Sequence, residues 1–380
     1  MKILLCTPYL QQPDIVSGGI NIWANNLIQY YESIHSDLEL IPISFDRKTY
    51  INIKTNFIKR IYTGFKEYSR PIKQACQIMD NENIDIIHIC SSASLSLIKD
   101  YILIKEAQKR NIRTIIHFHF GRISELYTKN NWEWKLIYKI IMMVNTAITM
   151  DMNSYNTLSN LKLKNIVYCP NPLSPKIIEQ IKRQKGSIPR IPRKIIFIGH
   201  VIPSKGIYEL IKACIDIDNI ELHILGKIEN PIKMELQNIA KSKENGRWLH
   251  IRGEVSHEIV ISELLSASIF AFPSHTEGFP NVILEAMACE CPIIATPVGA
   301  IPEMLEFNKK ISCGICVDIH DSDMLKKGIK LYLNNNKYAT ECAKNAYDRV
   351  FKLYSMPIIW ENLSNIWENL PKHKLANNYH

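Results

Sequence analysis

The sequence has 380 residues, which is too long for one ordinary domain and predicts two domains of roughly 150–200 residues each. A hydrophobic share of 46% with 22% charged residues is typical of a soluble globular protein that can bury two cores. No apolar run reaches the roughly 18 residues of a membrane span. The opening run MKILLCTPYL is expected to form a first β-strand and not a signal peptide.

The charge of the chain is unevenly distributed. The net charge is +9, and residues 1–170 hold 20 Lys and Arg against 14 Asp and Glu. Residues 171–194 hold 7 against 1, whereas residues 195–380 hold 19 against 22. The basic excess therefore lies in the N-terminal half and in the segment that follows it. This bias suits an anionic partner (a phosphorylated acceptor, a membrane face or a nucleic acid), and it suits a solvated basic surface equally well.

Short apolar runs typical of buried strands alternate with helical patterns through both halves. The first series of strands is expected at 2–7, 38–45, 84–90, 113–120, 146–150 and 165–169. The second is expected at 194–199, 220–225, 248–253, 268–273, 291–296 and 314–319. Helices are expected between most of them, and at 321–334, 338–353 and 357–370. Apolar strands joined by helical crossovers predict an α/β fold with two parallel, doubly wound sheets.

The segment at residues 169–194, CPNPLSPKIIEQIKRQKGSIPRIPRK, is rich in Pro, Lys and Arg, as linkers are. It separates an N-terminal domain at 1–169 from a second domain at 195–355, with the linker itself at 170–194. Residues 356–380 follow as a closing helical segment. Ligands of open α/β sheets bind beyond the carboxyl ends of the strands, so two such domains that face each other make a cleft.

The ten cysteines lack the spacing of a secreted disulfide framework, and a reducing cytosol is therefore expected. Cys289 with Cys291, and Cys313 with Cys316, could be combined into a four-cysteine zinc site. However, Cys291 and Cys316 lie in apolar runs that predict buried strands. Core thiols are the preferred interpretation.

The stretch IIFIGHVIPSKGIYELI, residues 195–211, has the pattern of a strand, a glycine loop and a helix. The strand is expected to end at Gly199, and Ser204 is a candidate N-cap for a helix beginning near Lys205 and Gly206. Free N–H groups at the helix start and the Lys205 ammonium could hold a phosphate. The Gly-Lys-Ser/Thr order of a P-loop is missing, and a purely structural turn fits the stretch equally well.

A second loop-to-helix stretch, SHTEGFPNVILEAMACECP at residues 274–292, places two carboxylates eight positions apart. Glu277 precedes a Gly-Phe-Pro-Asn turn, and Glu285 lies one turn into the helix that follows. Carboxylates beside an anion-binding helix start suit hydroxyl groups that flank a phosphate, as in a nucleotide-sugar. The structural alternatives are a surface helix residue for Glu285 and a charge favoured by the helix dipole for Glu277.

The run EGFPNVILEAMA in this stretch resembles the E-x7-E signature of retaining GT-B glycosyltransferases, specifically glycosyltransferase family 4. Further stretches resemble family positions in the expected order: SGGINIWANNL (17–27), HFHFG (117–121), CPNPL (169–173), GHVIPSKG (199–206), RGEV (252–255) and TPVGAIPEML (296–305). The resemblance covers most of the chain. It implies the GT-B fold, with two facing Rossmann-like domains, the active site in their cleft, and a C-terminal helix that crosses back to the N-terminal domain.

The resemblance also implies how the donor is held. Lys205 would neutralise the donor diphosphate. Further contacts to the diphosphate would come from Gly18, Gly19, His200, Phe279, Pro280 and Asn281. Glu285 would hydrogen-bond the ribose hydroxyls, and Val255 would contact the nucleoside.

Two residues are implied at the reacting sugar, Glu277 against the donor sugar and His119 near the anomeric centre. His117 shares a strand face with His119, because side chains alternate along a strand, and the sequence does not separate the two. A satisfied polar pair in the core is the structural alternative for both histidines.

The sequence departs from the family pattern at two positions. His200 stands where the family usually has Arg, so a guanidinium fork on the diphosphate is replaced by a group that is mostly neutral at pH 7. Glu290 stands where the family usually has Gly, which puts the local helix C-cap geometry in doubt.

Together these features predict a retaining, hexosyl-type glycosyltransferase. It would move a sugar from a nucleotide-diphosphate sugar to a saccharide or polyprenyl-linked acceptor in the synthesis of a surface polysaccharide such as lipopolysaccharide. Fixed charges can stabilise the leaving diphosphate, so no metal and no cofactor are expected. The alternatives are a nucleotide-sugar epimerase or hydrolase of the same fold and a non-catalytic nucleotide-sugar-binding module.

The segment at 47–70 interleaves aromatic and basic residues. It is expected to be a loop of the N-terminal domain that meets an anionic acceptor or a membrane surface, in preference to a nucleic acid. The expected location is the cytoplasm, with peripheral contact at the inner face of the cell membrane.

Overall fold

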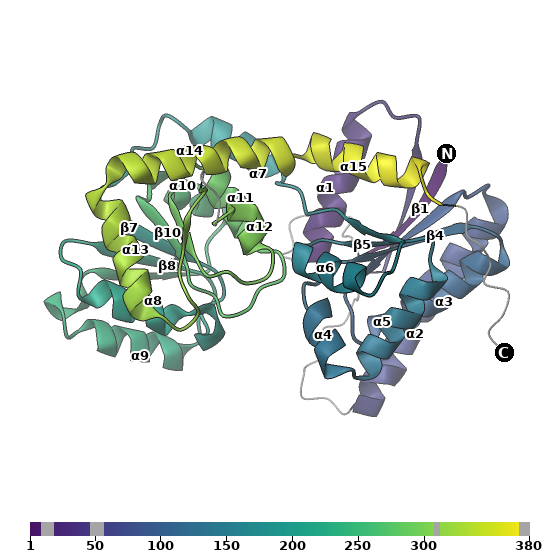
Figure 1. The fold of residues 1–380 in the computed structure, drawn as a ribbon, viewed down its shortest axis with the longest axis horizontal. Coiled ribbons are helices and arrows are strands. Elements are labelled where there is room, and N and C mark those ends of the chain that lie inside the picture. The colour runs from purple at the N-terminus through teal and green to yellow at the C-terminus, as the bar shows by residue number, and fades with distance from the viewer. Residues whose placement is uncertain (9–18, 46–56, 308–311, 372–380) are drawn as a thin grey trace. The chain divides into compact units, whose positions relative to one another are not determined.

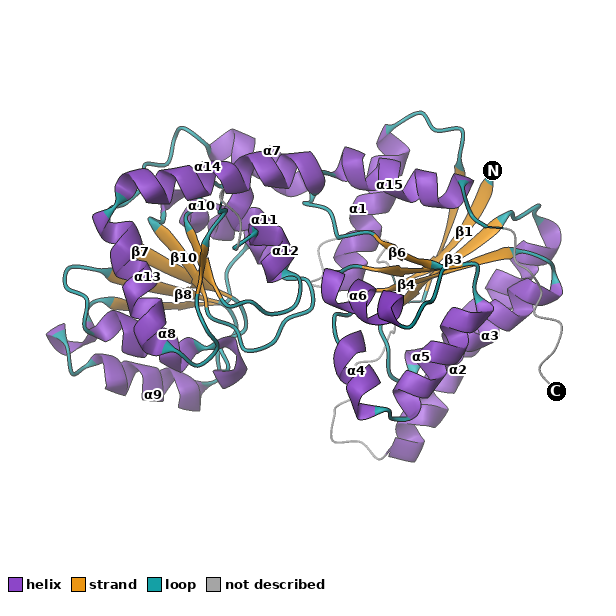
Figure 2. Cartoon of the chain, viewed as in Figure 1, coloured by secondary structure: helices purple, strands orange, loops and turns teal. Residues whose placement is uncertain are grey.

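The computed structural model of the chain describes residues 1–8, 19–45, 57–307 and 312–371 (Figure 1). The chain divides into two compact units. Unit 1 comprises Met1–Asn171 together with the chain from Ile359 onward, and unit 2 comprises Pro172–Ile358. Each unit has one sheet covered by helices (Figure 2). Within the described ranges, no helix combines the length and the apolar character needed to cross a membrane.

Unit 1 is built from six strands and the helices between them. The strands are β1 (Lys2–Thr7), β2 (Glu39–Ser44), β3 (Ile86–Ser91), β4 (Arg113–Phe118), β5 (Thr146–Thr149) and β6 (Ile166–Tyr168). The helices are α1 (Gly19–Ser33), α2 (Phe57–Asn81), α3 (Ser96–Lys109), α4 (Ile123–Lys129), α5 (Trp132–Met143), α6 (Met152–Asn160) and α15 (Met356–Glu368), which enters this unit at Ile359.

The sheet of unit 1 is parallel and has the strand order β2-β1-β3-β4-β5-β6. Every residue of β3 is buried, as expected for a strand with both sheet faces covered. On one face, Ile87 and Ile89 join a core cluster with residues of α2, α3 and α5. On the other face, His88 lies near Trp23 of α1 and Trp367 of α15. The second face therefore carries polar rings in a buried layer.

Unit 2 contains the second series of strands. They are β7 (Lys194–Ile198), β8 (Glu221–Leu225), β9 (Leu249–Gly253), β10 (Ile269–Phe272), β11 (Ile293–Ala295) and β12 (Ile315–Cys316). The helices are α7 (Pro175–Gln184), α8 (Ile207–Ile215), α9 (Asn230–Ala240), α10 (His257–Ser266), α11 (Asn281–Ala288), α12 (Ile301–Leu305), α13 (Ser322–Asn334) and α14 (Asn336–Leu353).

The parallel sheet of unit 2 has the order β12-β11-β10-β7-β8-β9. From β7 the chain builds outward through β8 and β9, and it then returns to place β10 on the other side of β7. The order of the strands therefore reverses between β7 and β10. Ligands of doubly wound sheets bind at such a switch point, beyond the carboxyl ends of the two strands.

Two segments differ from their sequence-based interpretation. Residues 57–70 were expected in a loop, but they belong to helix α2, which continues through Pro71. The remainder of that predicted loop, up to residue 56, lies outside the described residues. The expected linker contains helix α7, which begins with Pro175 at its first position and buries Ile177 and Ile181. Pro at the first position of a helix is favourable, so a proline-rich composition did not mean irregular structure here.

Candidate active site

The loops after β7 and β10 touch at the switch point of unit 2. A Cβ on Gly206 would lie 1.9 Å from the Pro273 carbonyl oxygen, so only glycine allows this approach. The backbone N–H of His275 donates to the Ser204 carbonyl at 2.9 Å. The predicted Ser204 N-cap is wrong, because residues 203–205 form a 3₁₀ turn and Gly206, at φ +69°, directly precedes α8. The left-handed conformation of Gly206 provides the sharp entry into the helix.

These two loops bring Lys205 and Glu277 together. Lys205 Nζ lies 2.5 Å from Glu277 Oε1, and the two side chains are 22% and 11% exposed. The contact joins residues 72 positions apart, one on each side of the strand-order reversal. A partly buried ammonium and carboxylate in direct contact can exchange partners when a stronger anion arrives.

The second predicted carboxylate, Glu285, is inside α11 and is only 5% exposed. His257, the first residue of α10, reaches it with Nε2 3.3 Å from Oε1. The contact with Glu285 raises the pKa of His257 above its usual value. The surface-helix alternative for Glu285 is therefore wrong. His257 was missed by the sequence analysis, since no pattern links it to a residue 28 positions later.

The start of α11 carries the predicted turn residues. Phe279 is buried and packs near Tyr354, while Pro280 occupies the N-cap position. The side-chain Oδ1 of Asn281 is buried and has no hydrogen-bond partner among the described residues. An unpartnered acceptor in a buried position is costly, and it marks a place where a ligand or water supplies the missing donor.

The C-terminal end of α11 resolves the doubt about Glu290. This residue has φ +51°, the left-handed conformation that glycine usually supplies after a helix. Its carboxylate is 2.6 Å from Lys185 Nζ of the segment after α7. The turn is thus kept despite the substitution.

Three other predicted donor residues take no part in the contacts described for these loops. His200 is exposed in the loop after β7, and Val255 is half-buried between β9 and α10. Gly19 is the first residue of α1, and a Cβ there would meet nothing within 4 Å. Gly18 lies outside the described residues.

In unit 1, the predicted His119 directly follows β4 and belongs to a buried group of rings. Its ring centroid is 4.0 Å from that of His117 and 4.6 Å from that of Trp23. Neither ring nitrogen of His119 has a hydrogen-bond partner within the described part of the chain. Burial lowers the pKa of His119 to about 3. The imidazole is therefore neutral at pH 7.

His117 differs from His119 in that its tautomer is fixed by neighbours. The Trp367 indole N–H, which can only donate, is 3.0 Å from His88 Nδ1. His88 is neutral, because burial lowers its pKa to about 3, so its proton is on Nε2. That nitrogen is 3.3 Å from His117 Nδ1 and donates to it. His117 consequently carries its own proton on Nε2, which has no partner in the described ranges and can act only as a donor.

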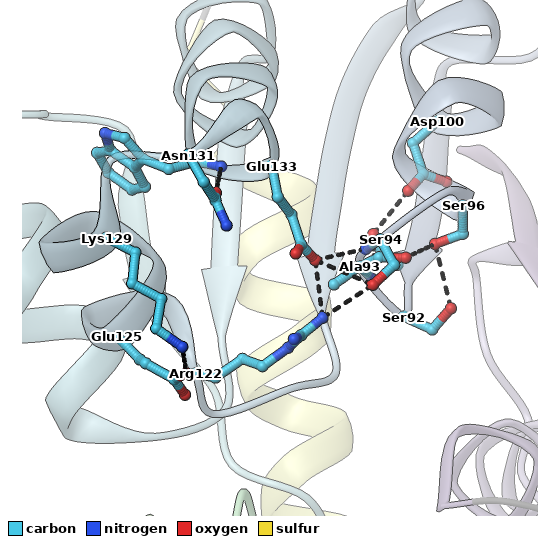
Figure 3. A network of polar contacts seen from close by, with 12 residues as sticks. Ser92, Ala93, Ser94, Ser96, Asp100, Arg122, Glu125, Lys129, Asn131 and Glu133 are labelled. Carbon is cyan, nitrogen blue, oxygen red and sulfur yellow. Dashed lines mark hydrogen bonds and ion pairs between the residues drawn. The ribbon is translucent and has the colours of Figure 1, made fainter. Parts of the chain in front are cut away.

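A second polar network holds the loops after β3 and β4 (Figure 3). The Glu133 carboxylate accepts from the backbone N–H of Ser94 at 2.7 Å and from the Arg122 guanidinium at 2.7 Å. Ala93 and Ser94 both have positive φ, at +67° and +55°. These contacts hold the two strained residues in place. They also anchor Arg122, three residues after His119, and no pattern in the sequence predicted them.

The four cysteines considered for zinc lie in the core of unit 2. Cys289, Cys291 and Cys313 are buried, and Cys316 is half-buried. Burial raises the pKa of Cys291 to about 11, which keeps the thiol protonated. A cavity of about 450 Å³ in the same unit is lined by Arg193, Ser268 and Pro292, at the amino ends of the strands. It is at the opposite edge of the sheet from Lys205 and Glu277.

The architecture of two parallel, doubly wound sheets is the two-domain α/β GT-B fold. The structure of Anabaena Alr3699/HepE in complex with UDP has this fold and matches 97% of the chain and 100% of its own length, with a TM-score of 0.70 and 14% identity. Residues 178–349 match the family model for glycosyl transferases group 1.

Curated relatives agree with this family match. The uncharacterized glycosyltransferase MJ1178 of Methanocaldococcus jannaschii is 26% identical over 367 residues, covering 95% of each chain. The capsular polysaccharide biosynthesis glycosyltransferase CapM of Staphylococcus aureus is 29% identical over 181 residues, covering 46% of each chain. These comparisons support a glycosyltransferase of the GT-B fold.

Proposed function

We propose that the chain is a retaining glycosyltransferase of family 4 that uses a nucleotide-diphosphate sugar as donor. The Lys205–Glu277 contact at the switch point of unit 2 carries this proposal. It offers a cation for a diphosphate and a carboxylate for sugar hydroxyls at the place where doubly wound sheets bind their ligands. The UDP complex of HepE, which shares the fold, supports a nucleoside diphosphate as the leaving group.

In this proposal the donor replaces one ion pair by two interactions. The diphosphate carries more charge than a carboxylate and takes over the Lys205 ammonium, which releases Glu277 toward the donor sugar. Charge grows on the diphosphate as the glycosidic bond breaks, and a cation already in place stabilises that change without reorganisation. Glu285 binds the ribose hydroxyls. The buried Oδ1 of Asn281, which has no partner among the described residues, accepts a hydrogen bond from the nucleotide-sugar. No metal takes part in this step.

His119 of unit 1 is proposed to contact the donor sugar, and the neighbouring His117 ring is proposed to support the His119 ring. A neutral imidazole with unpartnered nitrogens can accept or donate a hydrogen bond to a hydroxyl. His117 is restricted to donation by its fixed tautomer. The sequence left these two residues equivalent, and their hydrogen bonds favour His119 where the acceptor of a hydrogen bond is needed.

The donor site is tested by thermal shift and calorimetry with nucleoside diphosphates and nucleotide-sugars, without added metal. We expect one nucleoside diphosphate to bind the wild type saturably. Lys205→Ala should weaken nucleotide binding at least about 30-fold, because the diphosphate loses the partly buried ammonium that pairs with it. Lys212→Ala, at an exposed position of helix α8, which follows Lys205, is the matched control and should bind normally. A folded wild type that binds no nucleotide would contradict the proposal.

The reaction class is tested by turnover. An epimerase or hydrolase consumes the nucleotide-sugar without an acceptor, whereas a transferase requires a saccharide or lipid-linked saccharide. The anomeric proton coupling in the product shows whether the configuration is retained. Binding without turnover under all acceptor conditions would leave the non-catalytic binding module.

The acceptor is proposed to be a saccharide or polyprenyl-linked saccharide of a cell-surface polysaccharide, which the similarity to CapM supports. Peripheral contact with an anionic membrane in the cytoplasm belongs to the same proposal. Helix α5 supports it with an outer face on which Trp132, Tyr138 and Met142 are 51%, 42% and 47% exposed. Lys135 and Lys139 are exposed on the same helix. Aromatic and basic side chains together suit the interface of an anionic bilayer.

Sedimentation with anionic and with zwitterionic phospholipid vesicles tests this contact. We expect binding to anionic vesicles that weakens with salt and is reduced in Trp132→Ala. Met234→Ala, which removes a side chain that is 63% exposed in unit 2, is the control and should not change binding. Equal sedimentation with and without anionic vesicles at low salt would contradict membrane contact.

A further inference from the structure

Unit 2 contains a cluster of possible metal ligands that the proposed reaction does not use. Glu209 lies in the first turn of α8, His275 in the loop between β10 and α11, and His320 between β12 and α13. Glu209 Oε1 is 3.1 Å from His275 Nε2 and 3.0 Å from His320 Nδ1. One ligand atom from each residue lies within 4.8 Å of the other two.

The spacing of these atoms matches the geometry of a small transition-metal ion. Ligands at about 2.0–2.1 Å from a tetrahedral Zn²⁺ are separated from one another by about 3.3 Å. The two contacts of Glu209 are within a few tenths of an ångström of that value. The third separation involves His320, whose side chain is 66% exposed and can turn toward the ion. The exposed side also leaves a coordination position for water.

The surroundings of the cluster suit a cation. Glu209 lies in the first helical turn, where the helix dipole favours an ionised carboxylate, the form that binds metals. Asp318 and Asp321 flank His320 in the same loop and are exposed. His320 itself has φ +65°, a left-handed conformation that is unusual for a residue other than glycine. This conformation turns the chain between β12 and α13.

Two other groups of similar composition lack these properties. In the group of His88, Cys90 and His117, His88 Nδ1 is already occupied by the Trp367 N–H, and burial raises the pKa of Cys90 to about 12. In the group of Glu221, His223 and His250, His223 also faces Glu263, which is paired with the Lys194 ammonium at 2.7 Å. A nearby ammonium opposes a second cation.

We propose that Glu209, His275 and His320 bind a divalent transition-metal ion such as Zn²⁺ through one carboxylate oxygen and two imidazole nitrogens. The histidine protons then occupy His275 Nδ1 and His320 Nε2. The bound ion connects the start of α8 with the loops after β10 and β12. Since Lys205 precedes α8 and Glu277 follows His275 by two residues, the ion stiffens the segments that carry both proposed donor contacts. This role goes beyond the proposed function, in which no metal contacts the diphosphate.

The test uses the full chain after treatment with a chelator, in the absence of any nucleotide. Zn²⁺ is titrated in competition with a chromogenic chelator, and Co²⁺ is added separately to record its visible absorption. The variants are Glu209→Gln and His320→Gln, with His250→Gln as the control from another histidine group. Unfolding by urea without metal verifies that each variant is folded.

We expect the wild type to bind one Zn²⁺ per chain. Glu209→Gln and His320→Gln should weaken it at least about tenfold, the loss typical even for residues that only support a metal ligand. His250→Gln should bind as the wild type does. The proposal is overturned if the wild type does not compete with the chelator, if His250→Gln is the variant that loses the ion, or if Co²⁺ shows thiolate charge-transfer bands. None of these outcomes depends on nucleotide binding.

Discussion

The polar residues at the carboxyl ends of the two sheets are held in different ways. In unit 2, Lys205 and Glu277 form an ion pair, and His257 reaches the Glu285 carboxylate. In unit 1, the corresponding strand end carries His117 and His119, neutral rings in a buried layer, some of whose nitrogens have no partner in the part of the chain that the structure describes. The charged side chains at this edge of unit 2 are paired with protein groups, whereas His119 and the outer ring nitrogen of His117 have no hydrogen-bond partner among the described residues.

This difference has a physical reason. An ion in a partly buried position is costly without a counter-charge, so a site built for a charged ligand keeps a carboxylate on its lysine until the ligand arrives. A neutral imidazole can remain unpartnered at a smaller cost, and it gains hydrogen bonds when hydroxyl groups bind. The site of unit 2 is therefore suited to a charged ligand, and the histidine layer of unit 1 to neutral hydroxyl groups. The following changes test this comparison, in order of decreasing effect.

Gly206→Ala should have the largest effect, because it separates the loops that bring the charges of unit 2 together. The new Cβ would lie 1.9 Å from the Pro273 carbonyl, and the residue would have to keep a left-handed conformation. We expect a loss of more than about 3 kcal/mol in the free energy of unfolding, measured by urea titration. Gly186→Ala is the control, since Gly186 also has positive φ but open space around it, and should cost about 1–2 kcal/mol. Equal losses would show that the close approach is unimportant.

Trp367→Phe tests the neutral hydrogen bonds of unit 1. Without the indole N–H, the buried His88 Nδ1 loses its hydrogen-bond donor. We expect the free energy of unfolding to fall by about 1–3 kcal/mol. In ¹⁵N NMR spectra the protons of His88 and His117 should also redistribute between their ring nitrogens. Trp360→Phe is the control: Trp360 packs near Tyr31 and against the Trp367 ring, and the substitution keeps an aromatic ring there while the Trp367 N–H can still donate to His88. Unchanged histidine tautomers in Trp367→Phe would contradict the proposed chain of donors.

The pH dependence of stability distinguishes the two units. The folded state takes up a proton on His88 only near pH 3, whereas an unfolded histidine does so near pH 6.5. Between pH 7 and pH 5.5 the free energy of unfolding should therefore fall by about 1 kcal/mol for such a histidine, because the unfolded state takes up the proton and the folded state does not. Urea titrations should show a shallower slope in His88→Gln than in His200→Gln, which changes an exposed histidine. Identical slopes would mean that His88 is protonated in the folded state.

The smallest effect is expected at His257, for which the sign is reversed. Its pKa is raised by Glu285, so the contact contributes stability below the unfolded pKa near 6.5 and loses it as the pH rises through the raised value. His257 is 50% exposed, and the contribution should stay below about 1 kcal/mol. A double-mutant cycle of His257→Gln and Glu285→Gln at pH 5.5 and pH 9 measures it. A larger coupling at pH 9 would contradict an ionic contact.

Much of the fold could be predicted because its strands are continuous apolar runs. For β1, the predicted range and the observed Lys2–Thr7 coincide, and helix α1 (Gly19–Ser33) lies between two predicted strands, where a helix was expected. The first part of helix α2 was missed because its interleaved aromatic and basic residues suggested a loop. Helix α7 was missed because prolines flank it on both sides. Local composition thus identified buried strands better than it identified surface helices.

The candidate site could be predicted only where one short stretch contains its residues. Glu277 and Glu285 were found together because eight positions separate them. The partner of each was harder to predict. Lys205 was found as a cation, but not as the ion-pair partner of Glu277. His257 and Trp367 carried no signal at all, because side chains meet across 28 and 279 positions only after the sheets are assembled.

The bond between Trp367 and His88 has a consequence for the order in which the chain folds. The two residues are 279 positions apart, so a ribosome that adds about 5–20 residues per second makes the indole roughly 14–56 s after the imidazole. During that interval unit 2 is synthesised in full, while the N-terminal sheet still lacks the helix that covers its histidine layer. The unit that begins translation first is therefore the last to be completed.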